Sequence, residues 1–185
     1  ARLPEAIRRL SAAIEEGHVP APMSMETERE IKFPPEGWPV PALGYIDGFD
    51  GVSGEHPLVV DYKTTGSPDW ALRPETMARD PQVVLYAAWA LHAYPEAARV
   101  TVRLIYIKNK DGCQSWHAEL TLTREEVRGA MQEMQPITQD MALEAKKEEA
   151  KDVPATESSC GDFGGCPYRD HCDRLKHGAS TTPFG

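Results

Sequence analysis

The sequence has no long hydrophobic run: no stretch of its 185 residues approaches the roughly 18 consecutive apolar residues of a membrane-spanning helix. The first residues, Ala1 to Pro4, carry no apolar segment, so we expect no secretory signal. Basic residues are in the minority, because 20 Lys and Arg stand against 29 Asp and Glu and give a net charge of −9. This balance excludes a broad cationic surface of the kind that coats a polyanion.

Cysteine is almost absent from most of the chain. Cys113 is alone in the first 159 residues, and Cys160, Cys166 and Cys172 lie within thirteen residues near the C-terminus. A disulfide framework does not fit this distribution, since the rest of the chain is long enough to fold without cross-links and nothing indicates secretion. The clustering instead predicts a metal or metal-cluster site in a C-terminal region of residues 154–185, which follows a core of residues 1–153.

The hydrophobic pattern that is present predicts a mixture of helices and strands. Ile7, Leu10 and Ile14 recur at helical spacing, which predicts a first helix over residues 4–16. Short or alternating apolar runs predict strands, and longer Ala- and Leu-rich or capped segments predict helices. The expected strands are 30–33, 43–49, 57–63, 100–107 and 115–121, and the further helices are 75–93 and 123–152. We therefore expect an α/β fold in which helices flank a central sheet.

Two details of this prediction concern single side chains. Thr123 is followed three residues later by Glu126, which is the pattern of a capping box at the start of the last helix. Trp70 and Trp89 are interpreted as packing residues.

Acidic residues stand on two predicted strands that are otherwise apolar. Asp47 follows Gly44-Tyr45-Ile46, and Asp61 follows Leu58-Val59-Val60. An acidic side chain in such a place is costly unless it has a partner or a cation. Asp61 and Lys63 are two residues apart, so they face the same side of their strand. Two carboxylates on neighbouring strands can converge on a cation such as Mg²⁺, with the Tyr62 carbonyl as a further oxygen ligand. The alternative is a cross-strand ion pair of Lys63 with Asp47 or Asp61 at a sheet edge.

A second pair of polar side chains occurs on the helix predicted after these strands. Gln82 and Tyr86 are four residues apart, so they share one face of the helix. On the face that packs against the sheet, they would lie near the two carboxylates. The alternative interpretation is that Tyr86 belongs to the core and that Gln82 is an exposed helix residue.

In this order and on these elements, G-x-x-D ending at Asp47, the D-Y-K-T-T run from Asp61, and Q-x-x-x-Y from Gln82 resemble motifs of the PD-(D/E)XK nuclease superfamily. The added Q-x-x-x-Y is similar to that of its RecB-like branch, and the resemblance covers about residues 28–121. It implies a restriction-endonuclease-like core with a central mixed sheet. It also implies that Asp47 and Asp61 bind metal, that Lys63 is the catalytic lysine, and that Gln82 and Tyr86 face DNA.

The activity implied by this resemblance is hydrolysis of DNA phosphodiester bonds with Mg²⁺ or Mn²⁺. The branch further implies an exonuclease that acts at DNA ends in recombination, repair or phage DNA processing, in the cytoplasm of a bacterium or a phage-infected host. The alternative is a catalytically weak module that uses the same fold to bind DNA or a partner such as a helicase or recombination protein. The net charge of −9 favours this alternative, and the intact Asp47, Asp61 and Lys63 favour the enzyme.

The RecB-like branch usually has one more active-site residue upstream, a His or an acidic residue on the first helix. His18 follows the predicted first helix but lacks the family's G-x-x-x-H setting. Glu26, Glu28 and Glu30 are the alternatives, and the sequence leaves this position open.

The clustered cysteines have the spacing C-x5-C-x5-C. The resemblance extends to them, since several RecB-like nucleases, among them CRISPR-associated and phage exonucleases, hold an iron–sulfur cluster on one Cys before the core and three after it. It implies a 4Fe–4S cluster on Cys160, Cys166 and Cys172, with the fourth thiolate from Cys113 or from a cysteine upstream of this sequence. The alternative is tetrahedral zinc, with His171 or His177 as the fourth ligand.

Overall fold

The computed structural model describes residues 7–8, 11–12, 14–17, 25–51, 56–108 and 114–147. The chain divides into two units, residues 1–142 and residues 143–185, and each is described by itself. Of the second unit, only residues 143–147 are described. Within the described ranges, no helix is both long and apolar enough to cross a membrane.

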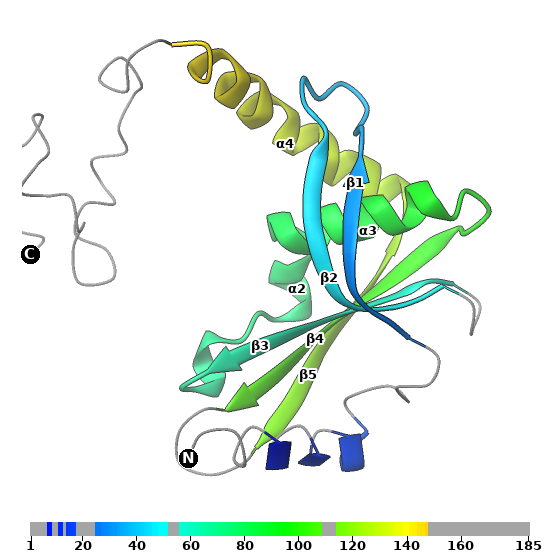
Figure 1. Ribbon diagram of the computed structural model, residues 1–185, viewed down its shortest axis with the longest axis vertical. Coiled ribbons are helices and arrows are strands. Elements are labelled where there is room, and N and C mark those ends of the chain that lie inside the picture. The colour runs from blue at the N-terminus through cyan, green and yellow to red at the C-terminus, as the bar shows by residue number, and fades with distance from the viewer. Residues whose placement is uncertain are drawn as a thin grey trace, which may run out of the picture. The chain divides into compact units, whose positions relative to one another are not determined.

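The first unit is built on one five-stranded mixed sheet (Figure 1). The strands lie in the order of the chain, and every neighbouring pair is antiparallel except β3 and β4, which are parallel. The predicted mixed α/β architecture with a central sheet is therefore confirmed. The strands are β1 (Glu26–Phe33), β2 (Ala42–Asp50), β3 (Leu58–Thr65), β4 (Arg99–Lys108) and β5 (Ser115–Thr123).

The parallel pair β3 and β4 requires a crossover connection, which three short or medium helices provide. These are the 3-10 helix η2 (Pro68–Trp70), α2 (Pro74–Met77) and α3 (Pro81–Ala93). The prediction of one continuous helix over 75–93 is wrong, because the chain leaves the helix between α2 and α3. Pro81 explains the break, since the residue before a proline avoids helical geometry while proline itself fits the first helical position. Asp80 caps α3 by accepting hydrogen bonds from the backbone N–H groups of Gln82 (3.0 Å) and Val83 (3.1 Å).

The main core lies between α3 and one face of the sheet. Val100, Val102, Leu104 and Tyr106 of β4 belong to it, whereas Ile105 packs with Val60 in a separate cluster. The strand predicted for residues 100–107 is thus confirmed, with its side chains on alternate faces of the sheet. Trp89 is a core residue as predicted, but Trp70 is 79% exposed, so its interpretation as a packing residue is wrong. The reason is that Trp70 ends η2, a surface turn with no buried residue.

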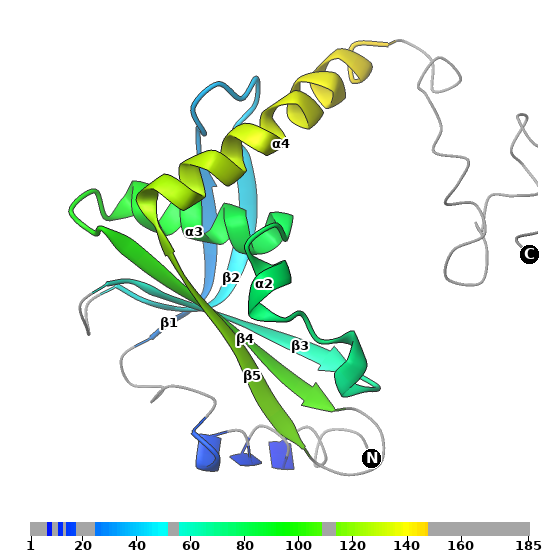
Figure 2. The ribbon, with the colours of Figure 1, turned by 180° about the vertical axis from the view of Figure 1, so that it is seen from behind.

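Helix α4 (Arg124–Glu144) follows β5 directly and lies across α3 on the same side of the sheet (Figure 2). The capping box is confirmed: the backbone N–H and hydroxyl of Thr123 both donate to Glu126 Oε2 at 2.7 Å. Arg124 donates to the carbonyls of Leu91, Tyr94, Pro95 and Ala97, which ties α4 to the end of α3. The helix ends at Glu144, so the predicted end near residue 152 is wrong. The charged run beyond it offers no apolar face for packing, and packing supplies most helix stability.

The N-terminal segment is helical at residues 7–8, 11–12 and 14–15, which agrees with the predicted first helix where the chain is described. Its last turn is joined to the far edge of the sheet, because Ser115 Oγ of β5 donates to Glu16 at 2.6 Å. The N-terminal segment therefore contacts the edge strand β5, whereas α3 and α4 lie on the core face of the sheet.

Candidate active site

The candidate site lies where β2 and β3 separate. These strands pair only at Gly48–Val60, Phe49–Val59 and Asp50–Leu58, whereas β2 continues to pair with β1 up to Ala42. In Figure 1, β1 and β2 turn away together from β3. Asp47 is the first residue of β2 beyond the shared ladder. Its Oδ2 accepts a hydrogen bond from the backbone N–H of Tyr62 at 2.7 Å, so a side-chain oxygen takes the place of a strand carbonyl.

An irregularity in the strands sets this separation. Ile46 and Phe49 are three residues apart, yet both belong to the main core, so the two-residue alternation is interrupted between them. Glu28, which lies between the paired residues opposite this point, has a φ of 52°. Gly48 permits close approach, because a Cβ there would lie 3.3 Å from the Cβ of Val60. Asp47 is thereby directed into the gap that β2 leaves beside β3.

Asp61 and Lys63 lie on the α3-facing side of β3, as their spacing predicts. Asp61 is only 4% exposed, and its Oδ2 lies 2.8 Å from Lys63 Nζ. Among the described residues, no donor meets this oxygen in good hydrogen-bond geometry, so the ammonium group is its principal stabilising contact. Lys63 therefore does pair with Asp61, but the ion pair lies within one interior strand and not across two strands at a sheet edge.

Gln82 joins the ion pair to helix α3. Its Oε1 accepts a hydrogen bond from Lys63 Nζ at 2.5 Å, and its Nε2 donates to Asp61 Oδ1 at 3.2 Å. The same Nε2 lies 2.8 Å from the hydroxyl of Tyr86, which it reaches one helical turn later. The shared face predicted for Gln82 and Tyr86 is confirmed, and the amide holds the carboxylate and the amine at once.

Tyr86 completes the network from inside the core. Its hydroxyl lies 2.6 Å from the carbonyl oxygen of Tyr45 and 3.3 Å from Asp61 Oδ1, and it can donate its one proton to either acceptor. The side chain is 5% exposed. Its hydroxyl is therefore directed into the protein, toward β2 and Asp61.

Burial dominates the electrostatics of the site. It raises the pKa of Asp61, against the opposing effect of the Lys63 ammonium, and the negative charge of Asp47 raises it further. Burial also raises the pKa of Tyr86 to about 12, with smaller contributions from Asp61 and Asp47. The pKa of Tyr62 is raised by burial and then by Asp47. The phenol of Tyr86 is consequently protonated at neutral pH, and the two carboxylates are close enough to influence each other.

The oxygen donors suit a hard cation that keeps part of its water shell. No group of three or more His, Cys, Asp or Glu side chains lies together among the described residues, so an all-protein cage is absent from this part of the chain. Mg²⁺ is typically bound by one or two carboxylates, with waters and substrate phosphates completing the octahedron. The pair Asp47 and Asp61, with a buried Asp61 oxygen that lacks a hydrogen-bond donor in the described residues, fits that requirement.

The other candidates from the sequence do not join this network. Glu26 pairs with Arg29, and Glu30 accepts a hydrogen bond from the Tyr45 hydroxyl at 3.2 Å, so both make their contacts on exposed parts of β1 and β2. His18 and all cysteine-site candidates lie outside the described residues: Cys113, Cys160, Cys166, His171, Cys172 and His177.

Two contacts of the site were not predicted. The bond from Tyr62 N–H to Asp47 depends on where β2 leaves β3, and the acceptor for Tyr86 is the backbone carbonyl of Tyr45, which has no signature in a sequence. The Q-x-x-x-Y spacing singled out Gln82 in the sequence. In the structure, the direct contacts of Gln82 are with Lys63 and Asp61.

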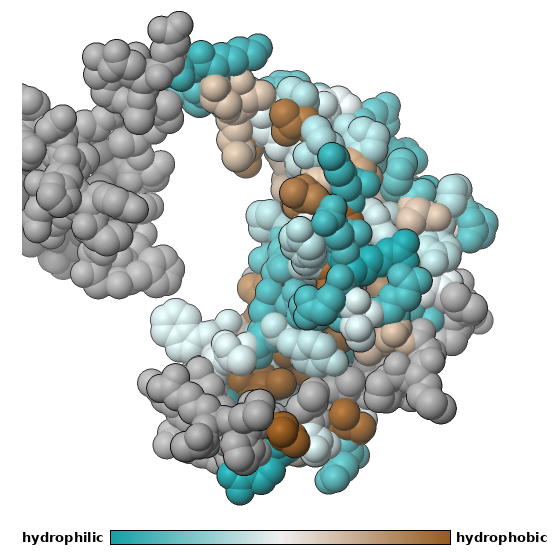
Figure 3. Space-filling view, in the orientation of Figure 1, coloured by the Kyte–Doolittle hydropathy of each residue, from teal (hydrophilic) through white to brown (hydrophobic). Residues whose placement is uncertain are grey.

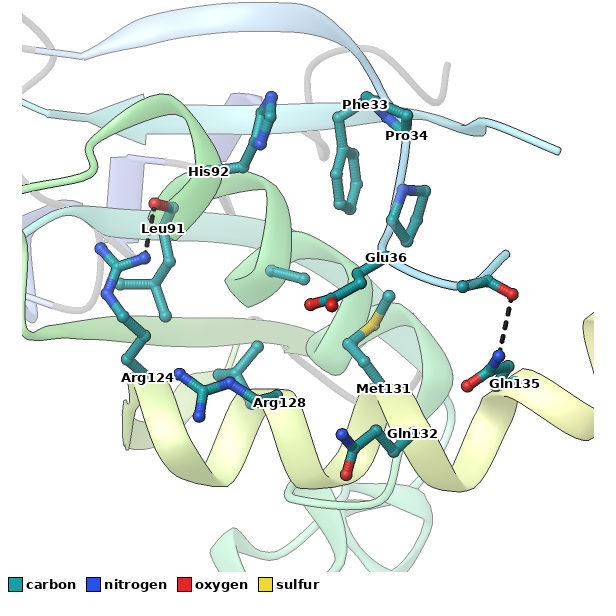
Figure 4. A pocket seen from close by; sticks show the side chains of 14 residues that line it. Phe33, Pro34, Glu36, Leu91, His92, Arg124, Arg128, Met131, Gln132 and Gln135 are labelled. Atoms are coloured by element: carbon teal, nitrogen blue, oxygen red, sulfur yellow. Dashed lines mark hydrogen bonds between the residues drawn. The ribbon is translucent and has the colours of Figure 1, made fainter. Parts of the chain in front are cut away.

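A separate hollow of about 480 Å³ lies between α3, α4 and the turn after β1 (Figure 4). Gln135 Nε2 donates to the Gly37 carbonyl across one end of it at 2.9 Å. Its walls combine apolar residues such as Phe33, Leu91 and Met131 with polar groups at the rim. None of the lining residues belongs to the network around Asp61.

Comparisons with known proteins identify the family of the chain. The family model described as the PD-(D/E)XK nuclease superfamily matches residues 1–173. Among solved structures, the crystal structure of SSO0001 is similar, with 18% sequence identity and a TM-score of 0.38 over 72% of this chain. The match covers 58% of the length of that protein. No curated protein matches the chain.

Proposed function

This chain belongs to the PD-(D/E)XK nuclease superfamily, and from that premise we propose that it is a Mg²⁺- or Mn²⁺-dependent deoxyribonuclease whose active site comprises Asp47, Asp61 and Lys63. One observation supports this site above the others. Asp47 Oδ2 accepts a hydrogen bond from the backbone N–H of Tyr62, the residue between Asp61 and Lys63. Both carboxylates and the amine are therefore brought to the same short stretch of β3.

Asp47, Asp61 and the backbone carbonyl of Tyr62 are the proposed ligands of the cation. When bound, a divalent cation lowers the pKa of a coordinated water and stabilises negative charge on a phosphate. The second oxygen of the Asp61 carboxylate is buried and pairs only with Lys63 among the described residues, so it retains capacity for a cation.

Lys63 is proposed to orient the attacking water and to stabilise the phosphate charge. Its side chain is 34% exposed, so the ammonium is accessible to a substrate even though its carboxylate partner is buried. Gln82 Oε1 fixes the ammonium from one side and Asp61 Oδ2 from another. A cationic donor held in this way interacts with developing charge without first reorganising.

Gln82 and Tyr86 are proposed as positioning residues. Through Gln82 Nε2 and the Tyr86 hydroxyl, two neutral groups face Oδ1 of Asp61 and leave Oδ2 for the cationic side of the site. Outer groups of this kind typically affect metal affinity or activity by about 10- to 100-fold. Direct contact of Gln82 and Tyr86 with DNA remains a prediction from the family resemblance.

The finer assignment follows the RecB-like motif order. We propose an exonuclease that acts at DNA ends in recombination, repair or phage DNA processing, with a structural 4Fe–4S cluster on Cys160, Cys166 and Cys172. An exonuclease degrades linear DNA and spares a covalently closed circle. Equal rates of degradation of linear DNA and of covalently closed circular DNA would overturn the exonuclease assignment and leave the nuclease assignment intact.

The test of the site uses end-labelled linear DNA with Mn²⁺ or Mg²⁺ and with EDTA. The parent is expected to degrade DNA only with the metal, and Asp61→Ala and Lys63→Ala are expected to lose this activity while retaining the circular dichroism spectrum of the parent. Lys32→Ala, an exposed lysine of β1, is the matched control and keeps full activity. Undiminished degradation by folded Asp61→Ala or Lys63→Ala overturns the assignment.

The second candidate is a module that binds DNA or a partner protein without efficient hydrolysis. The net charge of −9 is the observation that favours it. This second candidate predicts that the parent protein binds end-labelled DNA in a gel-shift experiment. It also predicts that the parent releases no label with either metal.

A further inference from the structure

Trp70 is an unusual surface residue. It is 79% exposed, whereas Trp89 is 5% exposed and Trp38 and Trp116 are partly buried. On the face drawn in Figure 3, hydrophilic residues cover most of the described surface and apolar side chains gather only in small separate patches. Because tryptophan is highly buried on average, the exposure of Trp70 distinguishes it from the other three tryptophans of the chain.

Local hydrogen bonds order the backbone on both sides of Trp70. Thr65 Oγ1 donates to the Ser67 carbonyl at 2.8 Å, and the Ser67 hydroxyl accepts from Asp69 N–H at 3.3 Å. After the indole, Ala71 N–H donates to the Pro68 carbonyl at 3.0 Å. Binding through a residue on a preordered segment costs little conformational entropy, so an exposed ring here is suited to recognition.

This segment is fastened to the strand next to the one that carries the proposed catalytic lysine. Leu72 N–H donates to the Tyr106 hydroxyl at 2.9 Å, and Tyr106 is the partner of Lys63 in the parallel ladder of β3 and β4. Neighbouring strands are about 4.8 Å apart. The chain two residues beyond Trp70 is therefore anchored to the strand that adjoins Lys63.

A hollow next to the segment offers room for a planar group. It has a volume of about 510 Å³ and is lined by residues 68–69 and 71–74, on either side of Trp70, and by residues 116–119 of β5. Arg73, Trp116 and His117 are in this lining beside the acidic Asp69 and Glu119. Trp116 is stacked on Tyr106, with ring centroids 5.6 Å apart and an interplanar angle of 10°. Aromatic and cationic groups together are typical of surfaces that hold unpaired bases.

We propose that Trp70 stacks on an unpaired nucleobase of the DNA strand that enters the active site. The inference rests on the proposed nuclease function and adds a strand-binding element to it. A net charge of −9 makes neutralisation of the phosphate backbone a weak source of affinity. Base stacking does not depend on that charge and is tolerant of sequence.

The first test measures binding of a fluorescein-labelled oligothymidine to the full chain by anisotropy, with Ca²⁺ in place of Mg²⁺ to limit hydrolysis. Trp70→Ala is expected to raise the Kd by at least about fivefold, the lower end of measured stacking contributions. Trp70→Phe, which keeps a ring, recovers most of the affinity. Ile137→Ala, a similarly exposed apolar residue on α4, is the matched control and leaves the Kd unchanged.

The second test separates stacking from charge. With an oligonucleotide of abasic sites, which keeps the phosphates, Trp70→Ala and the parent are expected to bind equally. With the oligothymidine, the ratio of their Kd values stays constant as salt is raised, because no phosphate contact is lost. Quenching of protein fluorescence by the oligothymidine is expected in the parent and reduced in Trp70→Phe.

The outcomes distinguish this inference from the nuclease assignment. Equal Kd values of parent and Trp70→Ala for the oligothymidine overturn the stacking proposal, whatever the hydrolysis assay shows. A loss of affinity for the abasic oligonucleotide as well also overturns it, since the effect is then not on a base. If Trp70→Ala weakens binding of the oligothymidine but not of the abasic oligonucleotide, and the parent releases no label in the hydrolysis assay, the stacking proposal stands. Only the catalytic role is then rejected.

Discussion

The carboxylate of Asp47 accepts the backbone N–H of Tyr62 at 2.7 Å, and this one hydrogen bond joins β2 to β3 beyond the end of their ladder. The bond gives Asp47 a structural role in addition to its proposed role as a metal ligand. Substitutions at this position can therefore separate the two roles.

Asp47→Asn is expected to keep the fold and lose the nuclease activity. The asparagine carbonyl oxygen can still accept from Tyr62 N–H, but it carries no charge for a cation. Asp47→Ala leaves a partly buried N–H without its acceptor, which costs about 1–3 kcal/mol. Urea unfolding and the metal-dependent release of label measure the two effects. An asparagine variant as active as the parent contradicts the proposed ligand role, and an alanine variant as stable as the parent contradicts the structural one.

Gln82→Leu is expected to lower the rate of DNA hydrolysis by about 10- to 100-fold without unfolding the protein. The leucine has a similar volume but can neither accept from Lys63 nor donate to Asp61. Rates at saturating DNA, measured over a range of Mn²⁺ concentrations, report the effect on the site itself. Gln132→Leu on α4 is the matched control. A variant with unchanged rate at every Mn²⁺ concentration shows that the amide does not position the site.

Tyr86→Phe is expected to change the alkaline stability of the protein. The pKa of Tyr86 is raised from 10.0 to about 12, chiefly by burial, so the folded state holds this proton more firmly than the unfolded state. That contribution to stability is complete below pH 10 and is lost as the pH rises through about 12. The free energy of unfolding of the parent should therefore fall more steeply over this interval than that of Tyr86→Phe. Parallel curves for the two proteins rule out a buried phenol in the native state.

The capping box at the start of α4 predicts a change in acid stability. The backbone N–H and hydroxyl of Thr123 lower the pKa of Glu126 from 4.5, so the folded state favours the carboxylate. This contribution is present above pH 4.5 and is lost as the pH falls through the lower, folded-state pKa. Glu126→Gln should flatten the acid limb of the unfolding curve, whereas Glu125→Gln should not. Thr123→Ala should cost about 1 kcal/mol near neutral pH. Thermal unfolding at several pH values checks all three variants.

The cysteine cluster predicts a coloured protein. Anaerobic purification should yield a brown preparation with an iron–sulfur absorption band, and Cys166→Ser should remove both the colour and the iron. Iron and zinc analysis of the same samples distinguishes the cluster from tetrahedral zinc. A colourless preparation with stoichiometric zinc establishes the alternative instead.

Much of the candidate site follows from the sequence because its spacings are local. Asp61 and Lys63 share a face because strand side chains alternate, and Gln82 meets Tyr86 because residues four apart are neighbours on a helix. The break before α3 was also encoded locally, in Pro81, although the Ala- and Leu-rich composition around it favoured one longer helix.

The tertiary structure alone decided how these pieces meet. The separation of β2 from β3, the contact of Asp47 with Tyr62 and the choice of the Tyr45 carbonyl as acceptor for Tyr86 all depend on residues distant in the chain. Trp70 shows the same limit, because its hydrophobicity predicts burial while the fold leaves it exposed at the end of η2. Local patterns specify which side chains share one face of a strand or helix. The packing of α3 against the bent sheet determines which of these side chains come into contact.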